Sequence, residues 1–167
     1  VILWDVTGSL LPKEPNHKDL DGTPLPTFAT GNGLWTSLKK AIIGCINYVE
    51  DNPNSMIYII PFDDTLDTTF TRRATDEGKA DLINFVTTFH FREYTSTNIV
   101  DPIKEFYKLL DLSAINYMFL FTDGVHNKDS IDNLISTIKA WNQKTKGFNA
   151  YGFCFSKQFL VCSKCRG

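Results

Sequence analysis

The segment Val1-Ile2-Leu3-Trp4-Asp5-Val6-Thr7-Gly8-Ser9 opens the chain and points to its fold class. Its first four residues are a continuous apolar run, and polar side chains then follow at every second position. A short apolar run of this kind predicts a strand buried on both faces, as in a parallel sheet. We therefore expect a buried strand that delivers Asp5, Thr7 and Ser9 at its carboxyl end.

The rest of the chain alternates between helical and strand-like patterns. Apolar residues spaced three and four apart predict helices over residues 34–49, 76–89, 99–110 and 130–146. Apolar β-rich runs predict buried strands over 56–62, 116–122 and 150–155, and a threonine-rich stretch after the Asp63-Asp64 turn predicts an edge strand over 65–71. This order predicts an α/β fold: a doubly wound, mostly parallel sheet with one antiparallel edge strand and helices on both faces.

Length and composition indicate a single domain. The chain has 167 residues, of which 43% are hydrophobic, and this is enough for one sizeable core. We place the domain at residues 1–155 and expect residues 156–167 to be a tail without a further helix or strand. A net charge of −2 offers no basic field for phosphates, which argues against a nucleic-acid partner. No apolar run approaches the roughly 20 residues that cross a bilayer, so no membrane segment is expected.

The four cysteines do not indicate a disulfide framework. Cys45 and Cys154 lie in apolar patterns, which predicts buried thiols. Cys162 and Cys165 have the C-x-x-C spacing of half a zinc site or of a redox pair, but a second ligand pair is missing, so we expect an unpaired or reduced tail. The cysteines do not determine the cellular compartment, although they favour an intracellular one.

A long loop is expected directly after the first strand. Residues 11–32 have no sustained period and contain four prolines, at positions 12, 15, 24 and 26. Loops of this length inside compact domains are usually functional or mobile. Its position beside the polar end of the first strand makes it a candidate for partner contacts or for shielding of a site there.

Polar residues from three separate segments should converge at the carboxyl ends of the predicted strands, where open α/β sheets bind ligands. All of them offer oxygen, as hard divalent cations prefer. Because only two are carboxylates, Mg²⁺ fits better than a Ca²⁺ cage, with Mn²⁺ or Ca²⁺ as other options. The predicted metal ligands are Asp5, Thr7, Ser9, Thr97 and Asp123.

Three motifs carry a resemblance to a known family. Asp5-Val6-Thr7-Gly8-Ser9 resembles the Asp-x-Ser-x-Ser signature of the von Willebrand factor A, or integrin I-like, domain, which opens its metal-ion-dependent adhesion site (MIDAS). Ser96-Thr97-Asn98-Ile99 resembles the family's segment with a metal-binding threonine, and Phe121-Thr122-Asp123-Gly124 resembles the segment that supplies the last aspartate. Element order agrees over roughly residues 1 to 155.

The resemblance implies a role for each site residue. Thr7 and Ser9 would bind the metal directly, Thr97 directly or through water, and Asp5 and Asp123 directly or through a bridging water. A sixth position would be open to an Asp or Glu of a protein partner, so that the chain is a binding or adhesion module and not an enzyme. Thr7 replaces the usual serine, Ser96 replaces a common glycine, and the 11–32 loop is longer than usual.

Two alternatives stay open. The first eleven residues also resemble the first motif of haloacid dehalogenase-like phosphotransferases, in which Asp5 would be the nucleophile. Thr7 stands where most such enzymes have a second aspartate, and the segment around Thr97 would have no role. The other alternative is a von Willebrand factor A scaffold with a vestigial metal site.

Histidines and aromatic residues give weaker signals. His17, His90 and His126 lack ligand spacing and are expected at the surface or in loops, with His126 close to the predicted site. Phe89, Phe91 and Tyr94 flank the second loop, and we expect them to pack within the protein rather than to contact a partner.

Overall fold

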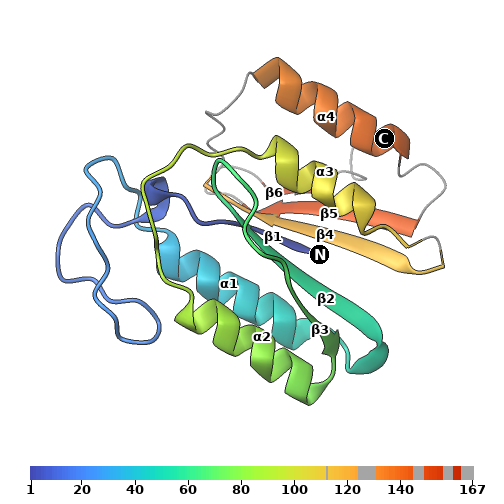
Figure 1. Cartoon of the computed structure of the whole chain (residues 1–167), viewed down its shortest axis with the longest axis horizontal. Coiled ribbons are helices and arrows are strands. Elements are labelled where there is room, and N and C mark those ends of the chain that lie inside the picture. Colours follow the sequence, from blue (N-terminus) through green and yellow to red (C-terminus); the bar gives the residue numbers. More distant parts are fainter. Residues whose placement is uncertain (112, 124–130, 145–148, 156–159, 163–167) are drawn as a thin grey trace. The chain divides into compact units, whose positions relative to one another are not determined.

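The computed structural model describes residues 1–111, 113–123, 131–144, 149–155 and 160–162 (Figure 1). Six strands form one sheet in the order β3-β2-β1-β4-β5-β6, flanked by helices. The strands are β1 (Ile2–Asp5), β2 (Asn52–Phe62), β3 (Phe70–Ala74), β4 (Ile115–Phe121), β5 (Asn149–Phe155) and β6 (Leu160–Cys162). The helices are the 3-10 turn η1 (Gly8–Leu10), α1 (Trp35–Tyr48), α2 (Asp76–Thr88), α3 (Val100–Lys108) and α4 (Ile131–Lys144). The predicted α/β class is confirmed.

The chain divides into two compact units, which are described separately. The first unit consists of Val1–Asp5, Ile60–Thr68 and the chain from Ser96 onward, and the second consists of Val6–Ile59 and Thr69–Thr95. Strand β2 contributes its last residues to the first unit and its earlier residues to the second.

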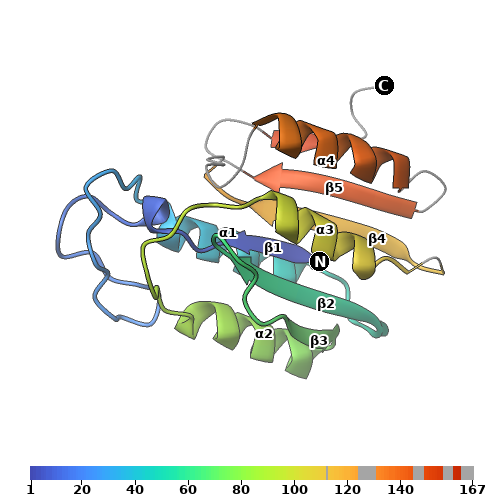
Figure 2. The ribbon, with the colours of Figure 1, turned by 45° about the horizontal axis from the view of Figure 1, so that its top comes forward.

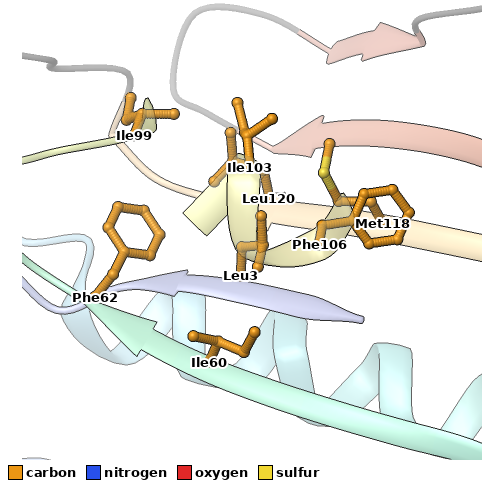
Figure 3. Close-up of a cluster of buried hydrophobic side chains, with 8 residues drawn as sticks. All are labelled: Leu3, Ile60, Phe62, Ile99, Ile103, Phe106, Met118 and Leu120. Atoms are coloured by element: carbon orange, nitrogen blue, oxygen red, sulfur yellow. The ribbon is translucent and has the colours of Figure 1, made fainter. Parts of the chain in front are cut away.

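In the first unit, β1 pairs parallel with β4 and β4 pairs parallel with β5. Helices α3 and α4 lie side by side along one face of these strands (Figure 2). The core between α3 and the strands is wholly apolar, and each fully buried side chain of this size contributes roughly 1.5 to 3 kcal/mol. Figure 3 shows its members, which are Leu3, Ile60, Phe62, Ile99, Ile103, Phe106, Met118 and Leu120.

In the second unit, β2 pairs antiparallel with β3, and α1 and α2 pack against each other. Helix α2 begins where the sequence predicts, because the Thr75 side chain accepts a hydrogen bond from the Gly78 N–H at 3.1 Å. Asp76 and Glu77 in its first turn add favourable charge at the helix N-terminus. The rings of Phe70 and Phe85 stack at 4.5 Å and join α2 to β3.

The loop of residues 11–32 is held by backbone hydrogen bonds at its base. The Asn32 N–H donates to the Ser9 carbonyl at 2.8 Å, and the Gly33 N–H donates to the Leu11 carbonyl at 3.0 Å. Gly31 is required there, since a Cβ at this position would lie 2.0 Å from the Leu11 oxygen. The end of the loop is thus bonded to the turn η1, after which the loop begins.

A buried ion pair anchors the middle of this loop. Lys39 Nζ of α1 lies 2.8 Å from Asp19 Oδ2, and the two side chains are 0% and 2% exposed. Trp35 Nε1 donates to the same oxygen at 2.9 Å, and Lys39 also donates to the Phe89 carbonyl at 2.6 Å. Burial lowers the pKa of Lys39, while the hydrogen bond and charge of Asp19 oppose that shift. The loop is therefore fixed to both α1 and the segment after α2.

A second, exposed contact holds the tip of the loop. His90 Nε2 lies 2.6 Å from Asp21 Oδ2, and this hydrogen bond holds the pKa of Asp21 well below its usual range. The Thr23 backbone N–H donates to the other Asp21 oxygen at 3.0 Å. The prediction of a surface or loop histidine is confirmed for His90.

Strand β3 begins later than predicted. Sequence patterning places an edge strand over residues 65–71, whereas β3 starts at Phe70. The Asp63 side chain accepts hydrogen bonds from the Thr65 N–H and hydroxyl, and Asp67 accepts from the Thr68 N–H. These local bonds compete with a strand ladder, so the stretch turns instead.

The sheet also has a strand that the sequence does not predict. Strand β6 lies in the stretch expected to be a tail and pairs antiparallel with β5, with Phe153 opposite Cys162. Cys165 and His126 lie outside the described residues. None of the helices in the described part of the chain is long and apolar enough to cross a membrane.

We predict that Asp19→Asn lowers the free energy of unfolding by about 3 to 5 kcal/mol, because it leaves the Lys39 ammonium buried without a counter-charge. Chemical denaturation measures this loss. The matched control is Asp81→Asn, which breaks the exposed pair with Arg72 at 2.8 Å and should cost less than about 1 kcal/mol. Equal losses in the two variants would contradict an anchoring role for the buried pair.

Candidate metal centre

Asp5 and Asp123 follow neighbouring parallel strands. The register pairs Trp4 with Phe121, so that Asp5, at the end of β1, comes beside Thr122, the residue after β4. The Thr122 hydroxyl donates a hydrogen bond of 2.7 Å to Asp5 Oδ2. Asp5, Thr122 and Asp123 are all buried. Two carboxyl groups and one hydroxyl therefore lie at one edge of the first unit.

Thr97 lies next to the carboxyl end of β2. It is buried, and the N–H of the following residue, Asn98, donates to the Asp63 carbonyl at 2.8 Å. The Asn98 side chain accepts from the Val100 N–H at 3.1 Å and donates to Asp101 Oδ2 at 2.8 Å, which fixes the start of α3. Because β2 neighbours β1 in the sheet, Thr97 joins Asp5 and Asp123 at the same edge.

Thr7 and Ser9 form a hydroxyl pair in the second unit. Their Oγ1 and Oγ atoms lie 3.0 Å apart, on the two sides of Gly8. The turn η1 brings them together: the Leu10 N–H donates to the Thr7 carbonyl at 3.2 Å, and the Leu11 N–H donates to the Gly8 carbonyl at 3.0 Å. Both hydroxyls thus point to the same side of the turn.

The five predicted ligands therefore form two groups. Asp5, Thr97 and Asp123 belong to the first unit, and Thr7 and Ser9 belong to the second. The groups are consecutive in the chain, since Val6 alone separates Asp5 from Thr7.

The donor set fits a hard divalent cation. Two carboxylates and three hydroxyls offer oxygen alone, and Mg²⁺ is typically held by one or two carboxylates with water in its remaining positions. The residues that the structure describes hold no group of three or more His, Cys, Asp or Glu side chains suited to a metal. The candidate ligand set contains only two such side chains, those of Asp5 and Asp123, because its other three ligands are hydroxyls.

Sequence patterning gave no role in the candidate site to Thr122 or to Tyr94, which lies against Gly8 between Thr7 and Ser9. In the sequence Thr122 is only a member of its motif, whereas in the structure its hydroxyl donates to Asp5, because the parallel register of β1 and β4 aligns the two residues. Tyr94 was expected to pack, as do Phe89, which is buried, and Phe91, whose ring meets that of Trp35 at 5.8 Å. Tyr94 packs against other rings but remains 53% exposed.

Comparison with protein-family models finds no match, and comparison with curated proteins finds none either. Solved structures do match, and they define the class of fold. A von Willebrand factor type A protein from Catenulispora acidiphila has a TM-score of 0.65 and 16% identity over 92% of this chain and 31% of that chain. The conserved hypothetical protein BatB from Bacteroides thetaiotaomicron has a TM-score of 0.61 and 13% identity over 93% of this chain and 64% of that chain.

A third similar structure is proximal thread matrix protein 1 from the mussel byssus, described with a zinc-occupied MIDAS motif. Its TM-score is 0.58, with 13% identity over 92% of this chain and 36% of that chain. This chain covers less than two thirds of each of these three proteins. It has the fold of the von Willebrand factor A domain, as the motifs predict.

We predict that Thr122→Val lowers the free energy of unfolding by about 1 to 3 kcal/mol, since it removes a buried hydrogen bond and leaves one Asp5 oxygen without this donor. Chemical denaturation is the measurement. Thr122→Ser keeps the hydroxyl and should retain most of the stability. A valine variant as stable as the serine variant would mean that this hydrogen bond contributes nothing.

Proposed function

We propose that this chain is a protein-binding module whose Mg²⁺ ion is held by Asp5, Thr7, Ser9, Thr97 and Asp123 and accepts an Asp or Glu side chain from a partner. The observation that carries the proposal is the Thr7–Ser9 hydroxyl pair, 3.0 Å apart, which follows the buried carboxyl group of Asp5 in the chain. Mn²⁺ or Ca²⁺ could take the place of Mg²⁺ at an all-oxygen site.

The charge of the ligand set supports binding of an acidic partner group. Asp5 and Asp123 supply at most two negative charges, and the three hydroxyls are neutral. A divalent ion held in this way keeps its attraction for one further carboxylate. The zinc-occupied MIDAS of the mussel byssus protein supports the view that this fold can hold a divalent ion at such a motif.

The environment of Asp5 supports a binding role more than a catalytic one. Asp5 is fully buried, and one of its oxygens accepts the Thr122 hydrogen bond. A carboxylate held in this way is suited to orient a metal or a metal-bound water. A phosphotransferase nucleophile instead needs an open approach for the phosphoryl group.

We predict that Mg²⁺ stabilises the parent protein and that Asp5→Ala or Asp123→Ala abolishes this effect. At a Mg²⁺ concentration one hundred times the Kd, binding to the folded state should add about 2.7 kcal/mol to the free energy of unfolding. Thermal unfolding with Mg²⁺ and with EDTA measures the difference. Asp132→Asn, an exposed acid at the start of α4, is the control and should respond as the parent does.

Two outcomes would contradict the proposal. A parent protein with no response to Mg²⁺, Mn²⁺ or Ca²⁺ would indicate a vestigial site. Turnover of an aryl phosphate that disappears in Asp5→Asn would indicate the phosphotransferase alternative.

A second prediction concerns the partner group. Peptides selected from a random library against the parent in Mg²⁺ should contain a required Asp or Glu, because the open metal position takes a carboxylate. Replacing that residue with Asn or Gln, or adding EDTA, should remove binding measured by fluorescence anisotropy. Peptides that bind equally well as the amide or in EDTA would contradict metal-mediated docking.

A further inference from the structure

Tyr94 lies against Gly8, the residue between the two proposed metal-binding hydroxyls. A Cβ at Gly8 would meet Tyr94 Cδ1 at 2.7 Å, and its three nearest neighbours would all be atoms of that ring. The backbone of Gly8 does not have a positive φ, unlike Gly22 and Gly33. The close approach of Tyr94 is therefore the reason that this position suits glycine.

The Tyr94 ring is itself held in place from the long loop. It stacks on Phe28 with a centroid distance of 4.9 Å and an angle of 23° between the ring planes. Its hydroxyl donates to the Thr27 carbonyl at 2.9 Å, and the Phe91 ring lies 5.0 Å away. Phe28 in turn is fixed through its N–H, which donates to the Pro12 carbonyl at 2.9 Å. Gly8, Tyr94 and the loop all belong to the second unit.

The turn that Tyr94 contacts is a weak element on its own. A 3-10 turn has poorer hydrogen-bond geometry than an α-helix, and the Leu10 N–H lies 3.2 Å from the Thr7 carbonyl oxygen. Backbone hydrogen bonds from the Asn32 and Gly33 N–H groups hold Ser9 and Leu11, so packing on Gly8 constrains the part of the turn that lies between the two hydroxyls. The ring of Tyr94 supplies such packing directly on the middle residue.

We propose that Tyr94 is a positioning residue for the metal centre: by packing on Gly8 it holds the turn in which the Thr7 and Ser9 hydroxyls converge. The consequence for the metal rests on the proposed function, and the consequence for the turn does not. The 11–32 loop then acts on the site through Phe28 and Tyr94. Residues that orient metal ligands typically alter metal affinity about ten- to a hundredfold when they are changed.

The test is a double-mutant cycle with two measurements. The variants are Gly8→Ala, Tyr94→Ala, the combination of both, and Tyr94→Phe, which keeps the ring but loses the hydrogen bond to Thr27. Amide hydrogen exchange at Leu10 and Leu11, recorded without metal, reports the turn. Isothermal titration with Mg²⁺ reports the site, and exchange in α3 and β4 checks that the rest of the chain is folded.

Gly8→Ala and Tyr94→Ala should each speed exchange at Leu10 and Leu11 and weaken Mg²⁺ binding about ten- to a hundredfold. Tyr94→Phe should behave as the parent does. In the Tyr94→Ala background, Gly8→Ala should have little further effect, because the ring that it would meet is gone.

Two results would overturn the inference. One is that Tyr94→Ala leaves the amide exchange at Leu10 and Leu11 as it is in the parent. The other is that Gly8→Ala speeds this exchange equally whether or not the Tyr94 ring is present. A parent protein that does not bind Mg²⁺ would defeat the proposed function instead. The metal-free exchange cycle would still decide the role of Tyr94.

Discussion

The parallel pairing of β1 with β4 is the constraint on which the rest of the candidate site depends. It sets Trp4 opposite Phe121 and thereby brings Asp5 beside Thr122, although 117 positions separate them in the chain. Parallel strands present their carboxyl ends at one edge of a sheet, so each strand end adds a polar group to the same region. The apolar core beneath α3 holds this pairing in register, because Leu3 and Leu120 both belong to it.

The second unit shows how a long loop can be ordered without a helix or strand of its own. Its base is closed by backbone hydrogen bonds, its middle by the buried Asp19–Lys39 pair, and its tip by the Asp21–His90 contact. Fixing so many loop residues carries a large cost in conformational entropy. The hydrogen bonds that Asp19 accepts from Trp35 and Lys39 join the loop to α1, and the aromatic stack of Phe28 on Tyr94 extends the ordered region to Gly8.

The two groups of candidate ligands would have different roles in the proposed docking site. In the proposed metal centre, the carboxylates of Asp5 and Asp123 would carry the charge, and the hydroxyls of Thr7 and Ser9 would bind without neutralising the ion. The anchored loop contributes an aromatic contact that constrains the turn. Such a ligand set would keep a cation attractive to an acidic group while limiting the freedom of its ligands.

The sequence by itself determined the fold class and the approximate helices and buried strands, because apolar periodicity reports which face of each element is buried. It also identified Asp5, Thr7, Ser9, Thr97 and Asp123 as candidates, since their motifs follow predicted strands or begin a predicted helix. Only the tertiary structure decided that Asp63 and Asp67 turn the chain before β3, that β6 adds a strand, that Thr122 donates to Asp5 and that Tyr94 lies against Gly8. These features depend on hydrogen bonds and contacts between particular groups, many of them distant in the chain, and such pairings leave no periodic signal in a single sequence.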